Sequence, residues 1–213
     1  MDYSKWVEDV VDFFERIRTT RGMDIVAEIA PPLRETELSA LSQSWPCEIP
    51  SALKEFWATG SSHLNCGYSF DEGSSEPFFP LGEYIRGGPE FEPAKYVFPG
   101  NSGLTPSDDV GNAEECRLYC ESAIFQFGCG GEYLALDVTS GSDDPPVVHL
   151  GKYSETTFVI SPSFTVFLEN WARMSYIGPD CWQTNYWRDE VSGFIDPEKY
   201  KSSELRSLLL TGN

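Results

Sequence analysis

Histidine is scarce in this 213-residue sequence, which limits the catalytic chemistry open to it. His63 and His149 are the only two, and neither belongs to a paired metal-binding motif such as HExxH. The GxxxxGK[ST] phosphate loop and the GxSxG nucleophile motif are also absent. These gaps argue against an enzyme. A triad assembled from distant residues stays open, as does a hydrolase built on carboxylates.

Long hydrophobic runs are missing as well. No stretch supplies 18 uncharged apolar residues, so we expect no membrane span. The N-terminal MDYSKWVEDVVDFFERI carries acids inside its apolar pattern, unlike a signal peptide. We therefore expect a cytoplasmic protein whose six cysteines are reduced thiols.

Two of these cysteines, Cys116 and Cys120, are four residues apart, so a helix would place both on one face. A zinc site would need two more ligands at compatible spacing, and none follows. We expect ordinary thiols, no metal and no cofactor.

Basic residues are few, 15 against 34 acids, which gives a formal net charge of −19. Such a field repels nucleic acid and anionic membranes and attracts basic partners. A role in solubility alone remains the simpler alternative, because net charge says nothing about fold.

Hydrophobic residues make up 40% of the chain, enough for one folded domain. Helical spacing predicts a helix that Ser4 caps and Gly22 ends, and a later helix that Ser161 caps. Short strand-like runs separated by turn residues predict strands in SAIFQF, EYLALDV, PVVHL and TFVI, which follow residue 121. The intervening 71–121 region is rich in turn residues and is predicted to be a loop-rich elaboration.

The segment FGCGGEYLALDV, residues 127–138, contains a glycine cluster that could bind phosphate or form a turn. It leads into a strand rather than a helix, so we interpret it as a hairpin turn. Glu132 and Asp137 are five apart on this strand and would point to opposite faces. They are not expected to share an acid–base site.

Several motifs follow one another in a family-like order. ETELSALSQSWPCEIPSALKEFWATGSS resembles two helices joined by a "Leu-Pro" turn, here Ile49-Pro50. Gly131-Glu132, the strand ending at Asp137, PVVHL and the Ser163–Leu168 segment SFTVFL come next. Over residues 31–174 the chain resembles the SUKH superfamily, in its yeast cell-wall-regulator branch.

The resemblance implies an α+β fold, a mostly antiparallel sheet of about five to six strands with helices packed on one side. The domain would span residues 1–178, and residues 179–213 would form an extension packed on it. The resemblance further implies a non-enzymatic protein-binding domain. The leading hypothesis is an immunity protein that masks the active site of a basic toxin, possibly a nuclease. The alternative is a regulatory scaffold with an endogenous partner.

Candidate partner contacts are acidic loops and aromatic side chains predicted to be exposed. Basic partners favour acids, and aromatic residues anchor interfaces. The candidates are Asp108, Asp109, Glu114, Glu115, Asp143, Asp144, Tyr96, Trp182 and Trp187. Two alternatives stay open: the acidic pairs as solvated turns, and the tail tryptophans packed against the domain.

Overall fold

The fold consists of one sheet with helices on both of its faces. The computed structural model describes residues 1–22, 25–71, 84–101, 113–128, 131–151, 157–178 and 181–211. Within this part of the chain, eight strands form one sheet, in the order β1-β2-β4-β5-β6-β7-β8 with β3 paired to β2. The strands are β1 (Val26–Ile29), β2 (Leu64–Asp71), β3 (Tyr84–Gly87), β4 (Glu90–Phe91), β5 (Ala123–Phe127), β6 (Tyr133–Leu136), β7 (Val147–Leu150) and β8 (Phe158–Ser161).

Every strand pairing is antiparallel, which confirms the predicted α+β class. The sheet has more strands than the five or six expected. The additional ones are short: β1 and β3 have four residues each and β4 has two.

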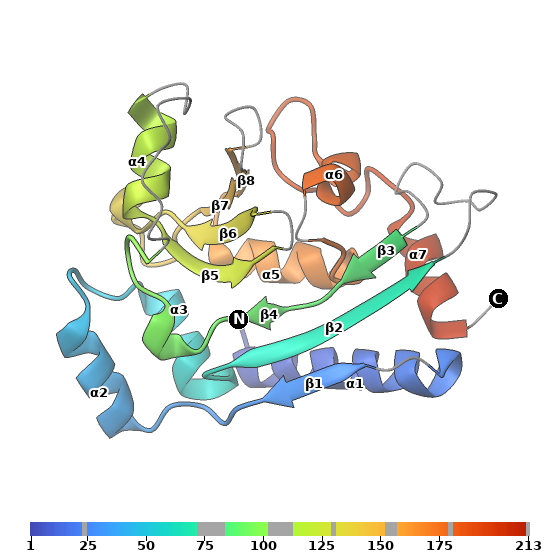
Figure 1. The fold of residues 1–213 in the computed structure, drawn as a ribbon, viewed down its shortest axis with the longest axis horizontal. Coiled ribbons are helices and arrows are strands. Elements are labelled where there is room, and N and C mark those ends of the chain that lie inside the picture. The colour runs from blue at the N-terminus through green and yellow to red at the C-terminus, as the bar shows by residue number, and fades with distance from the viewer. Residues whose placement is uncertain are drawn as a thin grey trace.

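The longest helix, α1 (Tyr3–Arg21), lies against one face of the sheet, and α5 (Phe164–Arg173) lies on the same side (Figure 1). Gly22 ends α1 in the left-handed conformation as predicted, but Asp2 caps it, not Ser4. The cap of α5 is likewise Ser163 rather than Ser161, because Ser161 is the last residue of β8. The other helices are α2 (Glu35–Ser44), α3 (Ser51–Glu55), α4 (Ala113–Glu121), α6 (Cys181–Thr184) and α7 (Ser202–Thr211).

An aromatic cluster fills the space between the sheet and these two helices. Phe91 of β4 lies at its centre, with ring centroids of five aromatic residues between 5.1 and 6.5 Å away. These residues are Trp6, Phe56, Phe125, Phe164 and Trp171. Because α1, β4, β5 and α5 all contribute, this cluster joins the N-terminal helix to residues 31–174, the part of the chain that resembles the SUKH superfamily.

Helix α4 covers the opposite face of the sheet, so not all helices pack on one side. Leu118 and Tyr119 of α4 form a second cluster with Ile124, Ala135 and Val148. Ala135 alternates along β6 with Leu134 and Leu136, which belong to the main core, and alternate residues of a strand point to opposite faces. Figure 1 shows α4 beside the β5–β6 hairpin.

The hairpin between β5 and β6 contains the glycine cluster. Phe127 pairs with Tyr133, the Gly128 N–H donates to the Glu132 carbonyl at 2.7 Å, and Gly131 has φ = +80°. The segment is therefore the hairpin turn that was predicted, although Cys129 and Gly130 lie outside the described residues.

Residues 181–211 pack along β8, α5 and α1. The Ile195 N–H donates to the Ile160 carbonyl of β8 at 2.9 Å. The Arg21 Nε donates to the Leu208 carbonyl of α7 at 3.1 Å. Leu205 and Leu209 of α7 are completely buried.

The turn after α5 places Ser175 and Tyr176 in the left-handed region, each with φ = 59°. Ser175 is buried, and its hydroxyl has no hydrogen-bond partner among the described residues. We expect Ser175→Gly to raise the free energy of unfolding by about 1 kcal/mol, because glycine tolerates this φ and the uncompensated hydroxyl is removed. Urea denaturation measures this change in the free energy of unfolding. The control is Ser122→Gly, which removes a similar buried hydroxyl where φ is not positive and should not stabilise. A lower midpoint for Ser175→Gly would contradict the prediction.

Candidate functional site

No helix among the described residues covers one part of the sheet on the side away from α1 (Figure 1). In β2, Leu64, Cys66 and Tyr68 point toward α1 and are buried, so Asn65, Gly67 and Ser69 point the other way. In Figure 1 no described element lies in front of β1, β2 and β4. We call this surface the open sheet face and define it by Glu28, Asn65, Gly67, Ser69 and Glu90.

The strand register gathers two carboxylates on this face. Glu28 of β1 and Glu90 of β4 both pair with Asn65 of β2, from opposite sides. All three side chains therefore share one row across the sheet. Both glutamates are exposed, and their strands are about 10 Å apart, twice the spacing of neighbouring strands. A basic side chain in front of Asn65 would lie between two negative charges.

Two glycines before β4 make close contacts with the backbone of other segments. A Cβ on Gly88, whose φ is +147°, would overlap the carbonyl oxygen of Cys66. A Cβ on Gly87 would overlap the carbonyl oxygen of Tyr176. Glycine at position 88 therefore permits the close approach to β2 that sets Glu90 opposite Asn65, and glycine at position 87 permits the approach to the turn after α5.

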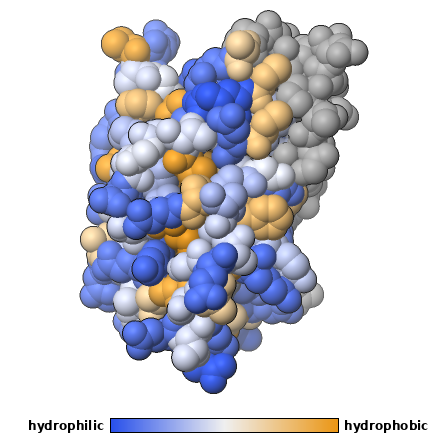
Figure 2. All heavy atoms as spheres, turned by 90° about the vertical axis from the view of Figure 1, so that its left-hand side faces the viewer, coloured by the Kyte–Doolittle hydropathy of each residue, from blue (hydrophilic) through white to orange (hydrophobic). Residues whose placement is uncertain are grey.

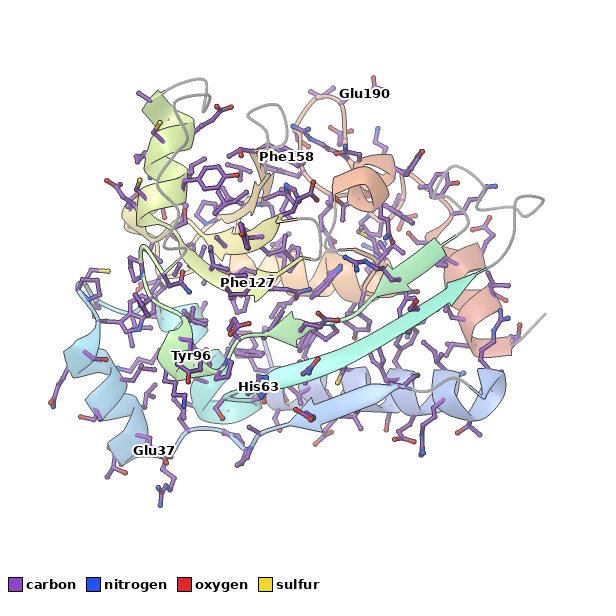
Figure 3. The ribbon with its side chains drawn as sticks, in the orientation of Figure 1. Glu37, His63, Tyr96, Phe127, Phe158 and Glu190 are labelled. Atoms are coloured by element: carbon purple, nitrogen blue, oxygen red, sulfur yellow. The ribbon has the colours of Figure 1, made fainter. Side chains whose placement is uncertain are left out.

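Exposed aromatic side chains border the open sheet face. Tyr96 is 52% exposed, Phe98 42% and Phe127 39%. Asn101 holds the backbone of the first two, because its side-chain amide donates to the Tyr96 carbonyl at 2.7 Å and its backbone N–H donates to the Phe98 carbonyl at 3.1 Å. The same side-chain amide donates to the Ile124 carbonyl of β5 at 2.9 Å. Figure 3 shows Tyr96, Phe127 and His63 grouped around β4. We call the three exposed residues Tyr96, Phe98 and Phe127 the aromatic rim.

The ionisable groups beside this surface are few. Burial raises the pKa of Glu92, and the nearby His63 acts in the opposite direction. The Cys66 thiol lies on the covered side of β2, where burial raises its pKa to about 12 and makes it unreactive. Within the described ranges, no three His, Cys, Asp or Glu side chains are placed to hold a metal ion. The arrangement offers carboxylates and aromatic rings for binding.

Asp137, at the end of β6, serves the fold. Its two carboxylate oxygens each accept a hydrogen bond of 2.9 Å from Arg117 of α4. Burial would raise the pKa of Asp137, but the bonds from Arg117 and Thr139 outweigh it and hold the pKa below its usual value. Glu132 lies elsewhere, with Oε2 at 3.3 Å from the buried His149 Nε2. The two acids thus have separate partners, as their spacing predicted.

Asp143 and Asp144 connect the loop before β7 to two helices. The Asp143 carboxylate accepts from the Ser51 hydroxyl at 2.8 Å, and its carbonyl accepts the Ala52 N–H of α3 at 2.8 Å. The Asp144 carboxylate accepts the Thr165 N–H of α5 at 3.0 Å. Both acids therefore accept hydrogen bonds from N–H or hydroxyl groups at helix starts, a role that was not predicted from the sequence.

The remaining predicted contact residues do not form one surface. Tyr96 is exposed and belongs to the aromatic rim. Glu114 is exposed and forms an ion pair with Arg117, whereas Glu115 is partly buried. Asp108 and Asp109 lie outside the described residues, as does the side chain of Trp182 in α6.

The prediction that Trp187 is exposed at a partner interface was wrong. Trp187 is fully buried and donates from Nε1 to the Ser202 hydroxyl at 2.6 Å. Its ring centroid lies 5.0 Å from that of Tyr200. The alternative interpretation, packing against the domain, describes this residue.

Four residues of this surface were not predicted from the sequence: Glu28, Glu90, Phe98 and Phe127. Glu28 alternates with Ala27 and Ile29 in VAEI, and Glu90 follows Gly87-Gly88-Pro89, a turn signal. Neither pattern shows that the two acids meet across β2, because that depends on pairing between strands distant in the sequence.

Comparison with known proteins identifies the family. The model of the SMI1/KNR4 family (SUKH-1) matches residues 32–170, about two thirds of the chain. No curated protein and no solved structure is significantly similar to it. SUKH domains are protein-interaction modules, and members of this family are generally non-catalytic. No helix of the described residues is both long and apolar enough to cross a bilayer. From its fold and this match, the chain belongs to the SMI1/KNR4 (SUKH-1) family.

Proposed function

We propose that this protein is an immunity protein, a non-enzymatic binder that neutralises a basic toxin domain by covering the toxin's active site. The observation that supports this most is the open sheet face. It presents two exposed glutamates beside three exposed aromatic residues, in a chain whose formal net charge is −19.

Charge complementarity selects the partner class. An acidic protein attracts a basic partner over long range and raises the association rate, and this effect weakens with salt. Once the partner has docked, aromatic side chains such as Tyr96 and Phe127 supply contact area at low entropic cost. Figure 2 shows the side that carries α2 and α4, where small orange areas alternate with blue ones. A mixed surface of this kind suits a reversible interface better than a permanent apolar one.

Nucleases are the toxin class that this charge fits best. Their active sites lie in basic grooves that hold phosphates, and nucleic-acid binding depends strongly on that charge. An acidic surface can occupy such a groove and exclude the substrate. The alternative, a regulatory scaffold in the cytoplasm, would use the same face but bind an endogenous enzyme or chaperone.

Capture from a lysate of the source organism tests the proposal. Three forms of the chain are immobilised: wild type, Glu28→Lys/Glu90→Lys, and the control Glu8→Lys/Asp12→Lys on α1. Both double variants change the charge by the same amount, and all four acids are exposed. We expect wild type and control to retain the same toxin domain, and the Glu28/Glu90 variant to retain at least tenfold less.

The retained domain is then assayed with and without wild-type protein. Inhibition of its activity, a nuclease activity in the favoured case, supports the immunity role. An endogenous enzyme retained without inhibition would replace this role with the scaffold role. Equal loss in both double variants would show attraction by overall charge and contradict the assignment of the open sheet face.

A further inference from the structure

The strand β1 forms an open edge of the sheet. Within the described part of the chain it pairs with β2 alone, through Val26–Gly67, Ala27–Cys66, Glu28–Asn65 and Ile29–Leu64. Figure 1 shows its other edge with no described segment beside it. The opposite end of the sheet differs, because the Ile195 N–H bonds to Ile160 of β8. Among the described residues, β1 is thus the end of the sheet where a further strand could pair.

The hydrogen-bond pattern shows which backbone groups face outward. The Ala30 N–H donates to the His63 carbonyl at 2.9 Å, just beyond the Ile29–Leu64 pair. Hydrogen-bonded and non-hydrogen-bonded pairs alternate in an antiparallel ladder. Glu28 therefore turns its N–H and C=O toward β2, and Ala27 and Ile29 turn theirs away. No hydrogen bond within the described residues uses these outward groups.

The side chains of β1 define what an added strand would meet. Glu28 is exposed on the open sheet face. Ala27 and Ile29 point to the other face and are also exposed, Ile29 at 38%. The edge thus presents apolar, acidic and apolar side chains in turn, so a complementary segment alternates basic and apolar residues.

We infer that the β1 edge is a docking site for an extended segment of alternating basic and apolar residues, which adds a strand to the sheet. Main-chain hydrogen bonds to Ala27 and Ile29 provide affinity, and a lysine or arginine beside Glu28 provides specificity. β1 precedes the stretch matched by the family model, residues 32–170, so this site belongs to the chain's own N-terminal region. The identity of the segment as part of a toxin rests on the proposed function, whereas the site itself does not.

A second copy of the chain is a poor occupant. Two β1 strands paired edge to edge would bring one Glu28 near the other, and like charges across strands destabilise pairing. The net charge of −19 on each copy adds long-range repulsion. A short strand with a central charge also fits the devices by which proteins limit self-association at edges.

The probe is the peptide acetyl-Lys-Val-Lys-Val-Lys-Val-Lys-amide, titrated into the full ¹⁵N-labelled chain and followed by NMR. We expect new protection of the Ala27 and Ile29 amides from hydrogen exchange, with shift changes centred on β1. Ala27→Pro removes an outward N–H without touching the β2 ladder and should weaken binding at least tenfold. The control Ala27→Val keeps the N–H and should stay within about threefold.

A second probe leaves the protein unchanged, in case Ala27→Pro disturbs the fold. The same peptide with alternate backbone nitrogens methylated cannot complete the ladder and should bind at least tenfold more weakly. Equal binding of both peptides, with shifts spread over the acids of α1, would overturn the inference. So would a dimer in sedimentation experiments that Ala27→Pro abolishes. Peptide binding at β1 without any captured toxin would support this site and refute the proposed function. Capture and inhibition of a toxin without peptide binding at β1 would support the proposed function and refute this site.

Discussion

Replacing Phe91 with alanine will lower the free energy of unfolding by about 3–5 kcal/mol, the range for truncating a large buried aromatic residue. Phe91 is 4% exposed and has aromatic neighbours from α1, β5 and α5. The cavity would open where these elements meet, and rings on every side have little freedom to collapse into it. Urea or thermal denaturation followed by tryptophan fluorescence measures the loss.

Two controls separate burial from residue type. Phe127→Ala makes the same truncation at a side chain that is 39% exposed, and it should cost about 1 kcal/mol or less. Phe91→Leu keeps most of the apolar volume and should cost about half as much as Phe91→Ala. Equal losses for Phe91→Ala and Phe127→Ala would contradict the assignment of Phe91 to the centre of the core.

Replacing Asp137 with asparagine will cost about 2–4 kcal/mol at neutral pH, because Arg117 loses a partly buried ion pair. The Asp137 side chain is 11% exposed and that of Arg117 is 29% exposed, so solvent screens the pair only in part. The pair joins α4 to the end of β6, and its loss should loosen the helix that covers β5–β7. Urea denaturation of both proteins gives the difference.

The same substitution has a defined pH dependence. The folded pKa of Asp137 lies below the unfolded value of about 3.9, so its stabilising effect is complete above that pH. It is lost as the pH falls through the folded pKa. The difference in unfolding free energy between wild type and Asp137→Asn should therefore be constant from pH 5 to pH 7 and shrink below about pH 4.

Glu114→Gln is the matched control, because it removes the other carboxylate that contacts Arg117. The Glu114 side chain is 65% exposed, and exposed ion pairs contribute little. Its effect should be only a small fraction of that of Asp137→Asn. A loss as large as that of Asp137→Asn would show that the exposed contact dominates, contrary to the geometry.

Local patterns made part of the fold predictable. β5 to β8 follow from short strand-like runs between turn residues, and the buried stripe Phe164, Phe167, Leu168 and Trp171 of α5 follows from helical spacing. Helix starts were harder to place, because Asp2 and Ser4, and likewise Ser161 and Ser163, are equally good caps by composition. Packing decides between them: the β8 ladder includes Ser161 and leaves Ser163 to cap the helix.

The contact residues were harder to predict for a related reason. An acidic pair in a loop looks the same whether it is solvated or caps helices, and Asp143 bonds to Ser51, 92 positions away. Trp187 is buried, and its indole N–H donates to the hydroxyl of Ser202 at the start of α7. Glu28 and Glu90 become neighbours only through β2. Local sequence carries none of these pairings.

Hydrogen exchange of the protein, with and without the partner captured from the lysate, tests the open sheet face most directly. Mass spectrometry of peptides from β1, β2, β4 and residues 94–101 should show slower exchange in the complex. Peptides from α1 and α7 should not change. Protection confined to α1 and α7, with none in β1, β2 or β4, would contradict the account and place the partner on the opposite side of the molecule.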